Sequence, residues 1–206
     1  SSGIGGGAFL LYYNNKSKQL LSLDGRETAP SSANEQLFLD AQKQPMEFFD
    51  AVVGGRSVGV PGVVELMWQS HQRHGKLAWA ALFEPAITLA KEGFIVSERL
   101  AQLVALDQQR LSQQMGTKAY FFTQDGSPIR AGQWLKNPDY VKTLRVIAKQ
   151  GSVGFYQGEV AQAIVNTVQK HPTNPGGLNL TDLQHYQVKT RPNTCINYQQ
   201  IYQICD

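Results

Sequence analysis

Four consecutive residues, Asp24, Gly25, Arg26 and Glu27, carry the groups in this sequence best suited to holding an anion. They place two carboxylates and one guanidinium directly after the apolar run at residues 19–23. A guanidinium can bind a carboxylate through two parallel hydrogen bonds, so Arg26 at the end of a strand is a candidate anion-binding residue. The alternative is a surface ion pair of small energetic weight. The residues alone leave both interpretations open.

No other reactive side chains form a recognisable catalytic set. Ser1 could act as an N-terminal nucleophile with its own α-amine as the base, but we interpret it as an incidental terminal residue. His71 and His74 share one face of a predicted helix end, where cationic groups suit the helix dipole, and a metal would need further ligands. His171 and His185 have no catalytic partner near them in the sequence. We therefore predict neither a metal site nor a cofactor.

The two cysteines, Cys195 and Cys205, flank a segment that reads as a β-hairpin turning near Gln200. Directly opposed residues in a hairpin approach the distance that a disulfide requires. Such a bond would indicate an oxidising compartment. The alternative is a pair of buried free thiols. Metal binding is disfavoured, because two thiols with no nearby histidine are too few ligands.

The composition is that of an ordinary globular domain. The chain has 206 residues, of which 42% are hydrophobic and 17% charged, and this permits one domain with a real core. The net charge of +3 comes from scattered basic residues, which disfavours nucleic-acid binding. No apolar run approaches the roughly 20 residues that span a bilayer, so we expect no membrane contact within this chain.

Both ends of the chain suggest a fragment or a processed protein. The sequence opens on a glycine-rich run with no signal peptide, and it stops on a strand-like segment without a following turn. Residues 3–7 loosely resemble a dinucleotide-binding fingerprint, but they precede a strand instead of following one. We interpret these glycines as a close approach of two backbone segments, where a side chain would clash.

Arg26 should be positioned by a hairpin and a set of helices. Apolar runs at residues 8–13 and 19–23 are joined by turn formers and predict the hairpin. A polar helix is expected at 33–41 and a long loop at 45–62. Apolar residues at helical spacing predict five further helices, at 63–75, 82–93, 97–111, 138–151 and 160–168.

Two shorter elements complete the prediction. A strand is expected at residues 120–123, turned by Asp125 and Gly126. Thr181 and Gln184 fit a capping box before a short helix that runs through Tyr186. The order of strands, many helices and then strands disfavours a doubly wound fold.

A series of motifs runs along the chain in one order. The motifs are GIGGGAFL at 3–10, DGRETAP at 24–30, SVGVPG at 57–62, HQRHGKL at 71–77, LFEPAITLAKEGF at 82–94, FYQG at 155–158 and GGL at 176–178, followed by Asp182, Leu183 and Tyr186. Each motif is weak alone, but the ordered series closely resembles the γ-glutamyltransferases and covers nearly the whole chain.

The resemblance implies an α+β fold, the N-terminal-nucleophile hydrolase αββα sandwich, of which this chain holds only part. Residues 1–206 would be one domain fragment of the large subunit. Such a protein is made as a precursor that cuts itself, and the first residue of the small subunit, a threonine, attacks the γ-glutamyl amide with its own amine as the base. No catalytic residue is then expected in this chain, and the isolated chain should be inactive.

The resemblance also implies the ligand, the partner and the compartment. Arg26 matches the arginine that binds the α-carboxylate of the γ-glutamyl group, and Glu27 is expected to support its loop. The substrates would be glutathione and related γ-glutamyl compounds, the partner the small subunit from the same precursor, and the compartment periplasmic or extracellular. Two alternatives remain: a cephalosporin-acylase-like or capsule-processing relative of the same fold, and a non-catalytic fragment that acts only as a binding module.

Overall fold

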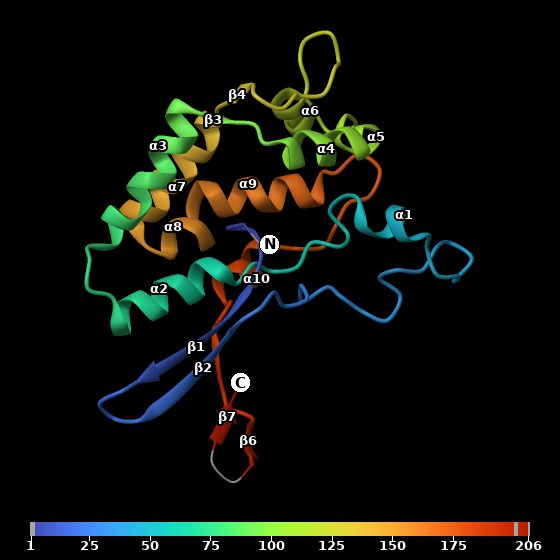
Figure 1. The fold of residues 1–206 in the computed structure, drawn as a ribbon. Coiled ribbons are helices and arrows are strands. Elements are labelled where there is room, and N and C mark those ends of the chain that lie inside the picture. Colours follow the sequence, from blue (N-terminus) through green and yellow to red (C-terminus); the bar gives the residue numbers. More distant parts are fainter. Residues whose placement is uncertain (1–2, 200–201, 206) are drawn as a thin grey trace. The chain divides into compact units, whose positions relative to one another are not determined.

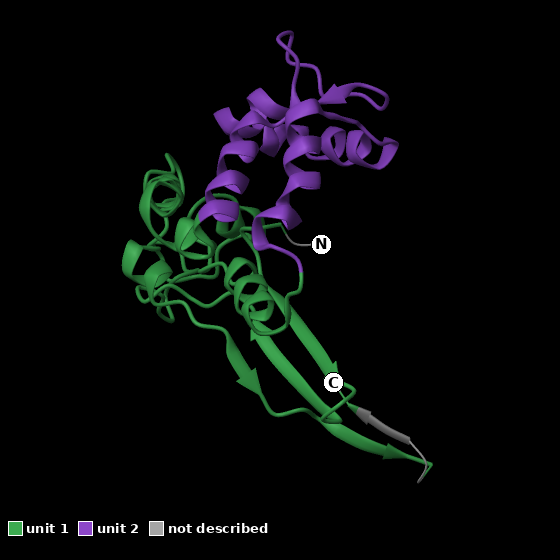
Figure 2. Ribbon diagram, turned by 90° about the vertical axis from the view of Figure 1, so that its left-hand side faces the viewer, with its two compact units in different colours: residues 1–76, 150–206 green, residues 77–149 purple. Residues whose placement is uncertain are grey.

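A computed structural model describes residues 3–199 and 202–205 of the chain (Figure 1). Ser1, the residue considered above as a terminal nucleophile, and Gln200, the predicted hairpin turn, lie outside the described residues. The chain divides into two compact units, residues 1–76 with 150–206 and residues 77–149 (Figure 2). Strands and helices are both present, and the strand pairs of the described chain are antiparallel, so the predicted α+β class is confirmed.

The first unit contains a three-stranded antiparallel sheet. Its strands are β1 (Ala8–Asn14), β2 (Gln19–Gly25) and β5 (Lys189–Arg191), in the order β1-β2-β5. The hairpin of β1 and β2 is the predicted one, and the Asn14 side chain closes its turn by accepting the backbone N–H groups of Lys16 and Ser17 at 3.0 and 3.3 Å. β5, which was not predicted, pairs beside the C-terminal half of β2.

Helices make up much of the rest of the first unit and contribute to its core. They are α1 (Phe48–Val52), α2 (Val63–His74), α8 (Val153–Tyr156), α9 (Gly158–Gln169) and α10 (Leu180–Gln184). α2 packs against both strands of the hairpin (Figure 1). Leu23 of β2, Val64, Phe155, Leu178 and Leu183 are almost fully buried and form the centre of this core. α2 begins after Pro61 and ends before Gly75, as predicted.

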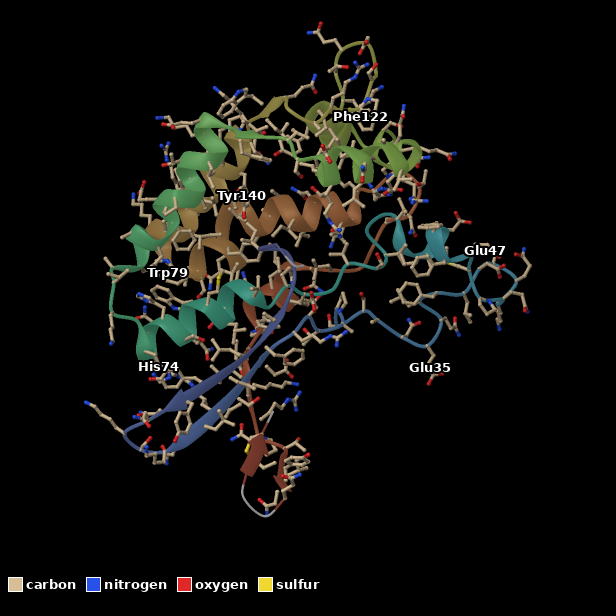
Figure 3. All side chains as sticks on the ribbon, viewed as in Figure 1. Glu35, Glu47, His74, Trp79, Phe122 and Tyr140 are labelled. Atoms are coloured by element: carbon tan, nitrogen blue, oxygen red, sulfur yellow. A yellow bond between two sulfur atoms is a disulfide. The ribbon has the colours of Figure 1, made fainter. Side chains whose placement is uncertain are left out.

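The second unit is mainly helical. It contains the 3₁₀ helix η1 (Trp79–Phe83), α3 (Glu84–Glu92), β3 (Phe94–Ile95), α4 (Glu98–Leu106), α5 (Gln108–Leu111), α6 (Met115–Phe121), β4 (Trp134–Leu135) and α7 (Pro138–Gln150). A buried cluster that includes Val96, Val104 and Leu135 forms its core. The Trp79 indole N–H, labelled in Figure 3, donates to the Ile147 carbonyl at 3.0 Å and ties the start of this unit to α7.

The helices predicted from periodicity are confirmed, with one interruption. Ser97 caps α4 as predicted, its hydroxyl accepting the Leu100 N–H at 3.2 Å. The helix expected over residues 97–111 is broken at Asp107, whose φ of −106° and ψ of 19° are not helical, and continues as α5. Pro138 opens α7 and Gly151 follows its end, also as predicted.

The polar helix predicted at residues 33–41 is wrong, because this segment folds as a series of turns. The Asn34 side chain accepts the backbone N–H two residues further on at 2.9 Å. The Asp40 carboxylate accepts the N–H groups two and four residues further on at 2.9 and 2.8 Å. Such side chains offer the backbone an alternative to helical hydrogen bonds. The loop predicted at 45–62 is wrong in part, since α1 lies within it.

The strand predicted at residues 120–123 is also wrong. α6 covers its first half, and only Phe122, labelled in Figure 3, forms an isolated β-bridge. A run of four residues is too short for its periodicity to distinguish a strand from a helix. The turn at Asp125 and Gly126 is confirmed, with the Asp125 carboxylate accepting the Ser127 N–H at 3.2 Å and Gly126 at a φ of +81°.

The predicted disulfide between Cys195 and Cys205 is present. These residues are directly opposed at the open end of the hairpin formed by β6 (Cys195–Tyr198) and β7 (Tyr202–Cys205), with Cα atoms 4.1 Å apart. They are ten positions apart in the sequence, so the bond closes a short loop. Within the part of the chain that the structure describes, no helix has the length and apolar character needed to cross a membrane.

The capping box before α10 is real but uses other residues than predicted. Asn179 caps the helix, accepting the Asp182 N–H at 3.0 Å, and the Asp182 carboxylate accepts the Asn179 N–H at 3.0 Å. Thr181 is inside the first turn and exposed, so its hydroxyl does not occupy the capping position. The helix ends at Gln184, two residues before Tyr186.

Replacing Asn179 with alanine is therefore expected to lower the free energy of unfolding by about 1 kcal/mol, the typical value for a lost N-cap. Thr181→Ala is the matched control and should leave stability nearly unchanged, because an exposed first-turn threonine satisfies no orphan N–H. Thermal and denaturant unfolding of the intact protein would measure both. Equal effects of the two substitutions would contradict this assignment of the cap.

Candidate anion-binding site

Arg26 follows the last residue of β2 and lines a cleft of about 550 Å³ in the first unit. The cleft is also lined by Glu27, Pro30, Phe38 and Arg56. The Arg26 side chain is exposed, and among the described residues its guanidinium has no hydrogen-bond or ion-pair partner. Its five N–H donors are thus available to a ligand that enters the cleft.

The backbone of Arg26, by contrast, is held on both sides. Its N–H donates to Asp24 Oδ1 at 2.9 Å, and its carbonyl oxygen accepts the Tyr186 hydroxyl at 2.8 Å. Two residues further on, the N–H of Thr28 donates to the Val60 carbonyl at 3.2 Å, and the Val60 N–H donates to the Thr28 carbonyl at 2.8 Å. The segment is therefore fixed by its main chain, while the side chain of Arg26 has no partner in the part of the chain that the structure describes.

Asp24 forms the ion pair that the sequence left open as an alternative, but its partner is not Arg26. Asp24 Oδ2 accepts from Nε and NH2 of Arg191 on β5, at 3.0 and 2.8 Å. The Arg26 N–H, and after it the Arg191 guanidinium, hold the pKa of the Asp24 carboxyl below its usual value. The Asp24 side chain is 15% exposed and the Arg191 side chain 52% exposed, so only the carboxylate of this pair is well shielded from water.

The glycine-rich run makes the close approach that was predicted. A Cβ atom at Gly7 would lie 2.7 Å from the Cα atom of Arg26 and 2.8 Å from the backbone nitrogen of Glu27, closer than real Cβ atoms come. The same Cβ would lie 2.7 Å from Glu27 Oε2, so the Glu27 carboxylate folds back over Gly7. The Gly6 carbonyl accepts the N–H groups of Gly62 and Val63 at 2.9 and 3.0 Å, which joins this run to the start of α2.

Arg56 is a second cationic residue of the cleft, and the sequence analysis missed it. Its Nε donates to Asn174 Oδ1 and its NH1 to the Leu37 carbonyl, both at 2.8 Å. Asn174 is buried, and its Nδ2 donates to the carbonyls of Asp50 and Val53 at 2.8 and 2.9 Å. The contacts of Asn174 join residues more than a hundred positions apart, so no local signal in the sequence could have revealed them.

The other reactive residues do not join Arg26 in this cleft. His71 and His74 lie in the last turn of α2, and His74 stacks on Tyr12 with ring centroids 3.8 Å apart (Figure 3). His171 Nδ1 accepts the Asn174 N–H at 3.1 Å, and His185 lines a separate cleft of about 430 Å³. Within residues 3–199 and 202–205, no group of three or more His, Cys, Asp or Glu side chains could hold a metal ion.

Comparison with solved structures identifies the fold. The crystal structure of Helicobacter pylori gamma-glutamyltranspeptidase matches 98% of this chain and 56% of its own, with 32% sequence identity and a TM-score of 0.90. A cephalosporin acylase from Bacillus halodurans matches 96% of this chain and 36% of its own, with 27% identity and a TM-score of 0.77. The chain is thus part of an N-terminal-nucleophile hydrolase fold.

Comparison of sequences identifies the family. A family model described as gamma-glutamyltranspeptidase matches residues 1–206. The chain is 37% identical over 193 residues to Scoloptoxin SSD14 of Scolopendra dehaani and 33% identical over 187 residues to a glutathione hydrolase proenzyme of Bacillus subtilis. Each alignment covers 91% of this chain and 31% of the relative, so the chain spans about a third of those proteins. The chain belongs to the gamma-glutamyltranspeptidase family.

The Asp24 pair makes a pH-dependent contribution to stability. A folded-state pKa below the ordinary aspartate value means that the stabilisation is fully present above about pH 3.9 and is lost as the pH falls through the lowered pKa. Asp24→Asn is therefore expected to lower the melting temperature at neutral pH, and the difference from wild type should shrink in acid. Thermal unfolding between pH 2 and 8, followed by circular dichroism, would measure it.

The matched control is Asp139→Asn, which removes an ion pair with Lys142 whose side chains are 86% and 77% exposed. Such a pair stabilises little, so the melting temperature should change little at any pH. An Asp24→Asn deficit of equal size at pH 2 and pH 7 would show that the carboxylate charge is not what holds this loop.

Proposed function

We propose that the intact protein is a γ-glutamyltransferase and glutathione hydrolase, in which Arg26 binds the α-carboxylate of the γ-glutamyl donor. The observation that carries the proposal is a guanidinium with no partner within residues 3–199 and 202–205, on a fixed backbone at the side of a cleft, in a chain of this family. Family membership supports cleavage of the γ-glutamyl amide. A bidentate contact with the carboxylate would orient the donor before the amide is attacked.

The nucleophile comes from outside this chain in the proposed reaction. The first residue of the small subunit, a threonine, attacks the γ-glutamyl carbonyl with its own α-amine as the base. The tetrahedral intermediate expels the amine of the cleaved amide, which takes up the proton that the threonine α-amine had accepted, and water or an acceptor amine then resolves the acyl-enzyme. An oxyanion hole from the small subunit stabilises the tetrahedral intermediate. Arg26 would contribute orientation of the donor, and Glu27 would support the Arg26 segment.

The exposed face of β1 supports the proposal that a partner packs on this unit. Phe9, Leu11 and Tyr13 alternate along one side of the strand and are 64%, 51% and 55% exposed. β1 is also at the edge of its sheet, with no strand beyond it in the described chain. A row of large apolar side chains beside an open edge is typical of a surface that is covered in the complete protein. The small subunit of the same precursor, formed by self-cleavage, is the proposed partner.

The Cys195–Cys205 disulfide supports a periplasmic or extracellular location. Disulfides form and persist in oxidising compartments and are rare where thiol reductants are abundant. The large-subunit assignment of residues 1–206 is part of the same proposal.

The two alternatives from the sequence are not favoured. The family model and the curated glutathione hydrolases support γ-glutamyl chemistry over that of a cephalosporin-acylase-like or capsule-processing relative. A purely binding module has no specific observation in its favour.

Arg26→Ala in the intact, processed enzyme is expected to raise the KM for a γ-glutamyl anilide at least about tenfold, since a charge-assisted contact of roughly 1.5–3 kcal/mol is lost. Arg26→Lys should be intermediate, because an ammonium keeps the charge but not the paired donors. Steady-state kinetics would measure both, with Arg73→Ala on the exposed side of α2 as the control. A KM unchanged in Arg26→Ala would remove this residue from the site.

The isolated chain is expected to show no hydrolysis of γ-glutamyl anilides, since the attacking hydroxyl belongs to another subunit. The full-length precursor, expressed in parallel, should cleave itself and turn over the same donor. Turnover by the purified 206-residue chain would show that the nucleophile is present within it.

A further inference from the structure

Tyr186 contacts the backbone of Arg26 although the two residues are 160 positions apart. Its hydroxyl donates to the Arg26 carbonyl oxygen at 2.8 Å. The contact is made to the main chain, so it leaves the guanidinium unoccupied. Together with the N–H bond to Asp24, it engages both backbone polar groups of Arg26.

The ring of Tyr186 rests on a rigid neighbour. It stacks on Tyr156 with ring centroids 5.8 Å apart and planes at 6°. Tyr156 is buried, and its hydroxyl donates to the Pro61 carbonyl at 2.7 Å and accepts the Glu65 N–H at 3.3 Å. The first turn of α2 therefore holds Tyr156, and Tyr156 in turn orients Tyr186.

Gly62, just before α2, provides the room for this contact. A Cβ atom there would lie 2.1 Å from the Tyr186 hydroxyl oxygen and 2.2 Å from the Gly25 carbonyl oxygen. The end of β2, the start of α2 and the Tyr186 hydroxyl thus meet at a point with no space for a side chain. This close fit fixes the Tyr186 hydroxyl relative to the end of β2, which Arg26 follows directly.

The Tyr186 hydroxyl remains a donor across the physiological pH range. Burial, and then the negative charges of Asp24, Glu27 and Glu65, raise the pKa of Tyr186 to about 12. Ionisation would convert the donor to an anion facing a carbonyl oxygen, so the contact with Arg26 persists until strongly alkaline pH.

We propose that Tyr186 is a positioning residue for donor binding: it fixes the Arg26 peptide and thereby the direction in which the guanidinium enters the cleft. This inference rests on the proposed function of Arg26. A tilt of about 10° at the Cα atom moves the end of a side chain roughly 6 Å long by about 1 Å, enough to misalign a bidentate contact. The Arg26 carbonyl lies at an exposed position, so water can replace the lost donor and the fold need not suffer.

The test is Tyr186→Phe in the intact, processed enzyme, which keeps the ring stacked on Tyr156 and removes only the hydroxyl. The KM for γ-glutamyl p-nitroanilide is expected to rise about threefold to tenfold with kcat within about twofold, since one neutral hydrogen bond contributes roughly 0.5–1.5 kcal/mol. The inhibition constant of L-glutamate should rise by the same factor. Tyr140→Phe, which removes a hydroxyl on α7 in the second unit, is the matched control and should behave as wild type.

A donor without the α-carboxylate distinguishes an effect on carboxylate binding from a nonspecific disturbance of the site. With 4-aminobutyryl p-nitroanilide, Tyr186→Phe and wild type should have the same kcat/KM, because there is no carboxylate for Arg26 to bind. In an Arg26→Ala background, adding Tyr186→Phe should cause no further loss with either donor.

The outcomes distinguish this inference from the proposal it rests on. If Arg26→Ala leaves the KM for the γ-glutamyl donor unchanged, the proposed role of Arg26 fails and this inference with it. If Arg26→Ala raises KM but Tyr186→Phe does not, Arg26 keeps its role and Tyr186 loses the positioning role. The same conclusion holds if Tyr186→Phe lowers kcat/KM by the same factor for both donors. A Tyr186→Phe protein that does not fold or process would show the hydroxyl to be structural and would also overturn the inference.

Discussion

The candidate anion-binding site depends on one residue, Arg26, whose main chain is held by hydrogen bonds while its side chain is left available to a ligand. The backbone N–H of Arg26 donates to Asp24 and its carbonyl accepts from Tyr186, while its guanidinium has no partner among the described residues. A cation left unpaired on a mobile loop would gain little from preorganisation, because ligand binding would then have to order the loop. Here the loop is ordered by contacts to β5, to the glycine-rich run and to the segment before α2.

The sequence predicts local elements well because their causes are local. The hairpin follows from two apolar runs separated by turn formers, and α2, α3, α7 and α9 follow from apolar spacing bounded by proline and glycine. The errors are local as well. Residues 33–41 have helical composition, but short polar side chains redirect their backbone N–H groups into turns.

Only part of the candidate site could be predicted from the sequence. Arg26 could be selected from its type and its place after a strand. The residues that hold this segment in place could not be predicted. Arg191 binds Asp24 from 167 positions away, and Tyr186 binds the Arg26 carbonyl from 160 positions away. The same holds for Arg56 and Asn174, whose contact depends on the packing of α1. Long-range pairing is a property of the folded chain, and a single sequence carries no spacing signal for it.

The open edge of β1 has a consequence for how this polypeptide can be produced. Within the described chain, β1 has one edge without a partner strand and a row of exposed aromatic and aliphatic side chains. Such an edge is a template for pairing with another copy, and natural proteins normally cover or blunt it. The chain made alone would therefore tend to associate edge to edge and precipitate. In the proposed precursor, the segment that covers this edge belongs to the same polypeptide, so it is present at high effective concentration before another copy can pair. Under that proposal, cleavage after folding would leave the edge covered from the start, which favours solubility as well as the chemistry.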